Sequence, residues 1–407
     1  MNWIIADQTL TSYMGHSFEY ARAICEQVRS SGGSATVLAG ASVSDKVIEE
    51  LGAIPCFHSG LDEDFAAPLY PLLPQRLHRL AREYNYYRHL RAVYADLVAQ
   101  EKRVVLDRHT VVLFPTVRHN QIAPIVKWAK RVAGTGGPRF CLVLRFTAFA
   151  TYSQPSLTEG LYRRAFRSLE RSRVRERFRL FSDSDLLARE YRDHTSLPVE
   201  ILPIPHVEGR AGNVAADSGN GSPGPIRLTY AGDARTNKGF HLLPYVFEKL
   251  APLTRRGLIL GEVQANIRDQ SEWIVRTAVH RLRRAGVTLH ETELTSADYY
   301  ALLDRAGIIL LPYTLDHYHA QTSGIFAEAM ARGKPVIVPR GTWMADQLRT
   351  YGAGVTFLPG DRQSLLEAVQ SAVESYEPLE RQARHRCRAW AAQHNARAFV
   401  EAIVNGS

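Results

Sequence analysis

The sequence is poor in cysteine and has no long apolar run. Its four cysteines lie far apart without a Cys-x-x-Cys pair, which suggests neither a zinc site nor a disulfide framework. We therefore expect a reducing, cytoplasmic setting. No stretch approaches the roughly 18 apolar residues of a spanning helix, although attachment to a membrane surface stays possible. The start of the chain has no basic segment, so Trp3 to Ala6 predicts a first strand and no signal peptide.

The length of the chain indicates more than one domain. At 407 residues it exceeds the size at which single cores usually divide. Lys and Arg number 50 against 41 Asp and Glu, a formal charge of +9. This balance favours anionic partners such as nucleotides, phosphates or an acidic membrane surface, but it does not choose among them.

Short aliphatic or β-branched runs alternate with helix-like segments, and this pattern occurs twice. It is typical of parallel α/β layers with crossover helices. The expected strands of the first half lie near Trp3–Ala6, Thr36–Leu38, Val111–Phe114, Phe140–Leu144, Leu180–Ser182 and Glu200–Leu202. Those of the second half lie near Arg227–Tyr230, Leu258–Leu260, Val287–Leu289, Ile308–Leu311, Val336–Val338 and Val355–Phe357.

A segment rich in Gly, Asn, Ser, Ala and Pro separates the two halves. Residues 209–225 cannot bury a core, so we predict a linker between an N-terminal domain, 1–208, and a C-terminal domain, 226–380. Residues 381–407 read as closing helices. Within the linker, 219–224 matches the dinucleotide fingerprint G-x-G-x-x-G. We reject this match, because no strand precedes it, a strand follows it and a proline lies inside it.

Residues 157–178 predict a basic amphipathic helix. Apolar residues recur there at near-helical spacing, and eight arginines fall between Arg163 and Arg179. A solvated face on a core helix is the favoured interpretation, and a surface for anionic lipid or a charged acceptor is the alternative. Nucleic acid is not an expected partner, since no recognised reading module accompanies the charge.

The second half contains a strand, loop, helix and strand unit that suits an anion. Ser323 precedes a helix that begins at Gly324, where the backbone allows close approach and the free N–H groups of the first turn favour negative charge. Glu328, one turn later, is either a ribose-binding carboxylate or an ordinary surface glutamate.

Two cations share a second loop of this half. Arg235 and Lys238 follow a strand and Gly232, and Gly239 comes next. Cations at the carboxyl end of a strand can neutralise the charge that develops on a leaving diphosphate, whereas loop cations of no function are simply solvated. Because ligands of open α/β sheets bind at these edges, two such loops strengthen the hypothesis of a diphosphate site.

With these motifs the chain resembles, over essentially its whole length, the retaining glycosyltransferases of family 4. That family has the α/β GT-B fold, two Rossmann-like domains with parallel sheets facing across a cleft. The similarity is most specific at 232–239 and 323–337. It extends to the glycine loop and first helix at 15–25 and to 381–404, which resembles closing helices whose last member crosses back to the N-terminal domain.

The resemblance implies roles for individual residues. Arg235 and Lys238 would stabilise the leaving diphosphate of a nucleotide-sugar donor, with UDP expected in preference to GDP. The other donor-binding residues would be Gly239, Gln321, Thr322, Ser323, Gly324, Ile325 and Glu328. The N-terminal domain would bind the acceptor, and its candidate residues are Gly15, His16, His119 and Arg145.

Three departures from the family pattern bear on these roles. Asp233 stands where the family commonly has arginine, so Arg235 takes that role. Ala320 replaces a glutamate that touches the donor sugar, a contact that Gln321, Thr322 or Asp316 could take over. Arg145 stands in place of a histidine near the reacting carbon. Tyr84, Tyr86 and Tyr87 suggest an aromatic acceptor surface.

The implied activity is hexosyl transfer to an acceptor hydroxyl with retention of configuration, in bacterial glycan, polysaccharide or glycoconjugate synthesis. The acceptor would be a glycan, a lipid-linked sugar or a small molecule. No obligatory metal or other cofactor is expected, because Arg235 and Lys238 supply the positive charge. We expect a cytoplasmic protein that could contact the anionic inner face of a membrane. The alternatives are a nucleotide-sugar epimerase of the same fold and a non-catalytic subunit that binds a partner.

Overall fold

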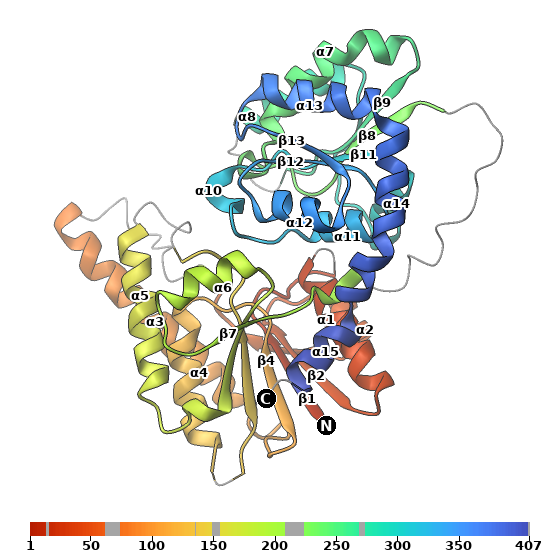
Figure 1. Cartoon of the computed structure of the whole chain (residues 1–407). Helices are drawn as coiled ribbons and strands as arrows, with labels where there is room; N and C mark the ends of the chain where they lie inside the picture. The colour runs from red at the N-terminus through yellow and green to blue at the C-terminus, as the bar shows by residue number, and fades with distance from the viewer. Residues whose placement is uncertain are drawn as a thin grey trace. The chain divides into compact units, whose positions relative to one another are not determined.

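The computed structural model describes residues 1–13, 16–61, 74–134, 136–148, 155–207, 224–267 and 273–405. They form two compact α/β units (Figure 1). Unit 1 consists of Met1–Pro203 and Phe399–Ser407, and unit 2 consists of Ile204–Ala398. Each unit is built on one parallel sheet.

Unit 1 has a seven-stranded sheet in the order β3-β2-β1-β4-β5-β6-β7. The order reverses between β1 and β4, which is the point where open α/β sheets bind ligands. The strands are β1 (Asn2–Asp7), β2 (Ser34–Gly40), β3 (Ile54–Phe57), β4 (Thr110–Phe114), β5 (Arg139–Val143), β6 (Phe178–Ser182) and β7 (Val199–Ile201). The helices are α1 (His16–Ser30), α2 (Asp45–Leu51), α3 (Gln75–Ala99), α4 (His119–Val132), α5 (Pro155–Glu170), η2 (Arg175–Arg177), α6 (Asp185–Arg192) and most of α15 (Ala396–Asn405).

Helices cover both faces of this sheet, so its central strands are apolar throughout. Alternate residues point to opposite faces. Ile4 of β1 packs into a cluster with residues of α3, α4 and α5, whereas Ile5 packs into another with α1 and with Phe399 of α15. The Tyr20 and Phe399 ring centroids lie 5.6 Å apart, which fixes α15 against α1.

Unit 2 repeats the arrangement with six strands in the order β10-β9-β8-β11-β12-β13. These are β8 (Ile226–Tyr230), β9 (Ile259–Gln264), β10 (Thr288–His290), β11 (Ile308–Leu310), β12 (Val336–Pro339) and β13 (Gly354–Phe357). The helices are η3 (Pro205–Val207), η5 (Thr236–Lys238), η6 (Phe240–Leu242), α7 (Leu243–Arg255), α8 (Trp273–Arg284), α9 (Ser296–Arg305), α10 (Leu315–Tyr318), α11 (Gly324–Ala331), α12 (Trp343–Tyr351), α13 (Arg362–Glu374) and α14 (Tyr376–Gln393). None of the described helices of the chain is long and apolar enough to cross a bilayer.

The structure corrects the prediction of one long basic helix over 157–178. The helix α5 ends at Glu170, a 3-10 turn follows, and Phe178 begins β6. Phe178 stacks on Phe140 of the neighbouring strand with ring centroids 4.9 Å apart, so strand pairing overrides the helical spacing of the apolar residues. The sequence-predicted linker lies outside the described residues except for Gly224 and Pro225, and so does the rejected fingerprint except for Gly224.

Two arginines of this segment have structural partners. Arg179 of β6 pairs with Glu200 of β7 at 2.5 Å and donates to the Ile403 carbonyl of α15 at 2.8 Å. Arg177 donates to the Gly137 carbonyl, with the donor and acceptor in close contact. The solvated-face interpretation therefore fits Arg163 and Arg164, which are exposed on α5.

Candidate functional site

The carboxyl ends of β8 and β11 meet in unit 2, because these two strands are neighbours in its sheet. The loop after β8 contains η5, and the loop after β11 leads to α10. Both the backbone N–H and the hydroxyl of Thr314 donate to the Asn237 carbonyl at 3.0 Å. The two loops singled out in the sequence are thus joined by hydrogen bonds at one edge.

Gly239 makes this junction possible. Its φ is +67°, and a Cβ atom at this position would lie 1.7 Å from the Pro312 carbonyl oxygen. Any side chain would therefore push the loop after β8 away from the end of β11. In the structure, Gly239 allows the backbone of the loop after β8 to lie close to the backbone at Pro312.

Gly232 shows where the Lys238 ammonium lies. A Cβ atom on Gly232 would be 2.9 Å from Lys238 Nζ and 2.7 Å from Cδ1 of Ile325, in the first turn of α11. The φ of Gly232, +97°, also favours glycine. Lys238 and the start of α11, which are far apart in the sequence, therefore both lie next to one glycine.

The start of α11 has the features of an anion-binding helix end. Ser323 is its N-cap residue, and the Ser323 hydroxyl accepts from the Phe326 N–H at 3.3 Å. Gly324 and Ile325 form the first turn, where backbone N–H groups have no partner inside the helix. Together with the adjacent Lys238, this turn presents positive charge at the edge of the sheet.

Arg235 belongs to the loop after β8, and its guanidinium is partly exposed. Arg235 Nη2 is 3.7 Å from Asp233 Oδ2, while its buried Nε has no hydrogen-bond partner among the described residues. The Lys238 ammonium is 5.9 Å from the centroid of the Tyr313 ring, and the Arg235 charge also acts on Tyr313. The charges of both cations thus act near Tyr313, and Asp233 neutralises part of the charge of Arg235.

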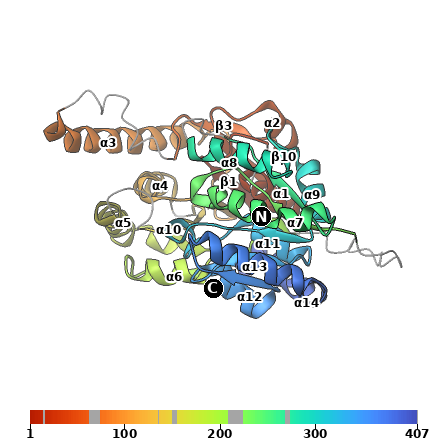
Figure 2. The same ribbon diagram turned by 90° about the horizontal axis from the view of Figure 1, so that it is seen from above.

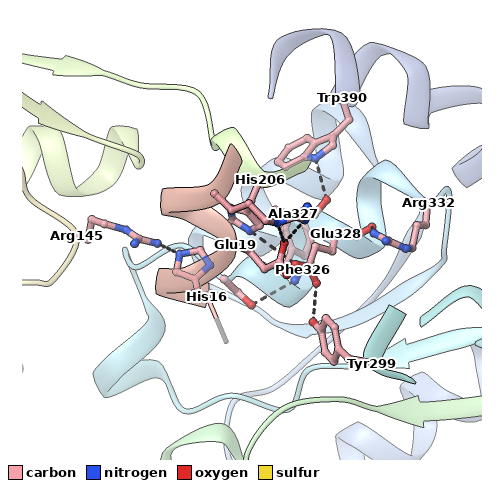
Figure 3. Close-up of polar contacts among 12 residues, drawn as sticks. His16, Glu19, Arg145, His206, Tyr299, Phe326, Ala327, Glu328, Arg332 and Trp390 are labelled. Atoms are coloured by element: carbon pink, nitrogen blue, oxygen red, sulfur yellow. Dashed lines mark hydrogen bonds and ion pairs between the residues drawn. The ribbon is translucent and has the colours of Figure 1, made fainter. Parts of the chain in front are cut away.

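Glu328 is buried, which rules out the ordinary surface glutamate considered from the sequence. Its side chain is only 6% exposed, and its Oε2 accepts from the Tyr299 hydroxyl of α9 at 2.5 Å. His206 Nε2 lies 3.9 Å from the other oxygen, Oε1. Figure 3 shows Tyr299 and His206 pointing toward this carboxylate. Burial and the charge of Glu328 raise the pKa of Tyr299 well above its usual value, so its hydroxyl keeps the proton that it donates.

Tyr299 and His206 were not predicted from the sequence. Tyr299 stands in an ordinary amphipathic helix, and His206 lies in a short turn between prolines and the linker, so neither carries a motif. Ala320, the position of the missing family glutamate, is buried at 1% exposure. Thr322 is also buried, Gln321 is half-buried and Asp316 is exposed on α10.

Unit 1 brings together two of its four candidate residues. Arg145 follows β5, and its Nη2 contacts Nε2 of His16 at the start of α1 (Figure 3). Arg145 Nε donates to Asp183, which follows β6, at 2.9 Å. Burial disfavours the charged form of Arg145, but Asp183, together with Tyr20 and Asp7, outweighs burial and raises the pKa of this guanidinium. The His16 and Arg145 side chains thus lie at the carboxyl edge of the sheet.

Of the other two candidates, His119 is not part of this cluster. His119 is 1% exposed, and its ring packs against Tyr162 and Tyr86 with centroids 5.3 and 5.8 Å away. Burial lowers the pKa of His119 to about 3, so the ring is neutral near pH 7. This environment is that of a core histidine. Gly15 lies outside the described residues.

We expect Asp183→Asn to destabilise the protein by about 3 kcal/mol, because it leaves the charge of Arg145 buried without its partner. The Asp183 side chain is fully buried and that of Arg145 is 12% exposed. Urea denaturation followed by circular dichroism measures the change. Asp185→Asn is the matched control, since Asp185 pairs with Arg189 on the surface of α6 and should change little. Equal effects of the two substitutions would contradict a structural role for the Asp183 pair.

Comparisons with known proteins point to the fold. No family profile and no curated protein matches the sequence. HepE of Anabaena in complex with UDP is similar in structure, with a TM-score of 0.65 at 11% identity over 100% of this chain and 99% of that one. A UDP-forming trehalose-phosphate synthase of Burkholderia xenovorans has a TM-score of 0.68 at 12% identity, over 100% of this chain and 99% of that one. Sucrose-phosphate synthase of Thermosynechococcus elongatus has a TM-score of 0.61 at 13% identity, over 100% of this chain and 98% of that one. The chain therefore has the GT-B fold, with two Rossmann-like units.

Proposed function

We propose that the protein is a glycosyltransferase that uses a nucleoside-diphosphate sugar, with UDP as the preferred nucleotide. The observation that carries the proposal is the meeting of Lys238, Gly232 and the first turn of α11 at one sheet edge. A lysine ammonium, a close backbone approach and the N–H groups of a helix start together suit a diphosphate. HepE was solved with UDP and with UDP-glucose, and the trehalose-phosphate synthase is described as UDP-forming.

In this proposal unit 2 holds the donor. Lys238 and Arg235 neutralise the charge that develops on the departing diphosphate, and the N–H groups of Gly324 and Ile325 donate to its oxygens. Glu328 accepts from the ribose hydroxyls. A carboxylate has about four lone-pair positions, so one carboxylate can accept from a tyrosine and from ribose hydroxyls at the same time. Gln321 and Thr322, next to the cap residue Ser323, are assigned to the sugar end.

Unit 1 holds the acceptor in this proposal, with His16 and Arg145 at its carboxyl edge. The acceptor hydroxyl would attack the anomeric carbon from the face that the diphosphate leaves, which retains the configuration and requires no carboxylate nucleophile. The C–O bond to the diphosphate breaks, the new glycosidic bond forms, and the hydroxyl proton passes to the leaving diphosphate. The positive charge needed at this step comes from Lys238 and Arg235 of the protein itself.

The test is to incubate the protein with UDP-sugars and glycan, lipid-linked or sugar-phosphate acceptors, and to detect both UDP and a glycosylated product by mass spectrometry. The proposal predicts both products in equal amounts. A changed sugar configuration without an acceptor product would instead identify an epimerase. Tight UDP binding with no turnover of any donor would favour a non-catalytic subunit.

We expect Tyr299→Phe to weaken UDP binding about threefold to tenfold, because the Glu328 carboxylate loses the hydrogen bond that orients it. UDP should lose more affinity than 2′-deoxy-UDP, which offers the carboxylate one hydroxyl fewer. Calorimetric titration measures both ligands. The matched control is Tyr245→Phe, which removes a hydroxyl that donates to Gln363 at 2.8 Å on α13. Equal losses of affinity for the two nucleotides would show that Tyr299 has no part in ribose recognition.

A further inference from the structure

The first half of helix α3 carries an exposed apolar stripe. Leu77, Leu80, Tyr84 and Tyr87 are 37%, 60%, 69% and 43% exposed. Their spacing of three, four and three residues places them on one side of a helix. We call these four residues the α3 stripe. Because large apolar side chains gathered on one exposed face usually mark an interaction surface, the stripe calls for a partner.

The stripe does not belong to the core of unit 1. The later turns of α3 bury His89, Val93 and Leu97, the last two in the core cluster shared with α4. At about 100° per residue, these three positions fall on the side of the helix opposite the stripe. Figure 2 shows the first turns of α3 extending beyond α4. The stripe therefore lies on the side of α3 that faces away from the core.

Exposed arginines lie beside the stripe. Residues 75–91 contain five arginines and one glutamate. Arg88 and Arg91 are exposed and continue the side of the helix on which the stripe lies. Arg164 of α5 donates to the Tyr87 hydroxyl at 2.8 Å, which joins the stripe to the exposed arginines of α5. The partner of this surface should thus be apolar and anionic at once.

We propose that the α3 stripe docks unit 1 onto an anionic lipid bilayer. Within the stripe the leucines come first and the tyrosines follow, and the exposed Arg88 and Arg91 continue the same side of the helix. This order matches the change from acyl chains through the interface to the headgroups, where aromatic rings and arginines are favoured. A second copy of the chain is a poorer partner, because pairing two stripes would bring their arginines together.

Vesicle sedimentation tests the proposal with the full chain. We expect the protein to sediment with vesicles of phosphatidylglycerol and phosphatidylcholine, and to remain largely in solution with phosphatidylcholine alone. The double variant Leu80→Glu with Tyr84→Glu should lose at least about tenfold of this binding, because it places negative charge within the stripe. Both side chains are mostly exposed, so the fold should be kept, which circular dichroism and an unchanged affinity for UDP can check. Leu358→Glu is the matched control, since Leu358 is an exposed leucine of unit 2, at 49%.

Results of three kinds would overturn the proposal. One is a wild-type protein that does not bind the anionic vesicles. Another is a double variant that binds them as the wild type does, or a loss of binding that Leu358→Glu reproduces. The third is a wild-type dimer in analytical ultracentrifugation that the double variant dissociates, which would identify a second copy as the partner of the stripe.

Discussion

Replacing Lys238 with alanine is expected to lower kcat about a hundredfold, the usual scale for one preorganised charge that stabilises a leaving group. The Lys238 ammonium lies next to Gly232, as does the Ile325 side chain at the start of α11. In the proposed complex it faces the diphosphate, where negative charge grows as the bond to the sugar breaks. Initial rates with a UDP-sugar measure the loss, and calorimetry with UDP measures the accompanying loss of affinity.

A comparison of UDP with UMP tests whether Lys238 acts on the second phosphate. Lys238→Ala should cost UDP more affinity than UMP, because UMP lacks the second phosphate. Lys249→Ala is the matched control: this lysine is exposed on α7, with its ammonium 5.8 Å from the centroid of the Tyr245 ring. Wild-type rates in Lys238→Ala, or equal losses of affinity for UDP and UMP, would show that Lys238 does not bind the diphosphate.

Replacing Glu328 with glutamine is expected to weaken the binding of UDP and UMP alike, by about tenfold to a hundredfold. The substitution keeps the shape of the buried side chain but removes the charge that accepts hydrogen bonds most strongly. Both nucleotides contain the ribose, so the loss should not depend on the number of phosphates. Calorimetric titration of each nucleotide measures the effect, and Glu328→Ala should be at least as damaging.

Glu367→Gln is the control for this substitution, since Glu367 is exposed on α13 and accepts from Gln363 at 2.9 Å. Circular dichroism of Glu328→Gln checks that the pair with Tyr299 is not needed for folding. Unchanged affinity for both nucleotides would show that Glu328 is a structural partner of Tyr299. A loss confined to UDP would place this carboxylate near the phosphates.

The fold could be predicted from the sequence because parallel strands buried on both faces are short apolar runs. All twelve expected strands have a counterpart, from Trp3–Ala6 in β1 to Val355–Phe357 in β13. The strand β3 was missed, because Ile54–Phe57 is only four residues long and contains Pro55. It pairs with β2 at the sheet edge, where a proline is tolerated. The error at Phe178 has another cause, the stacking on Phe140, which no local pattern reveals.

The candidate site was predictable where function depends on backbone geometry. Glycines after a strand and at a helix start indicated the loops that Gly239 and Gly232 now bring together. Contacts between distant segments were not predictable, such as the hydrogen bond from Tyr299 to Glu328. Nor could the sequence decide between His16, which contacts Arg145, and His119, whose ring is buried among tyrosines. These differences depend on which helices lie next to one another.

The central claim is that unit 2 binds a nucleoside diphosphate through its phosphates. Calorimetric titration of the wild-type protein with UDP and with UMP tests this claim most directly. We predict saturable binding of UDP, about tenfold or more tighter than that of UMP, because the second phosphate reaches Lys238 and the first turn of α11. Equal affinities for UDP and UMP, or no binding of UDP, GDP or ADP, would contradict it.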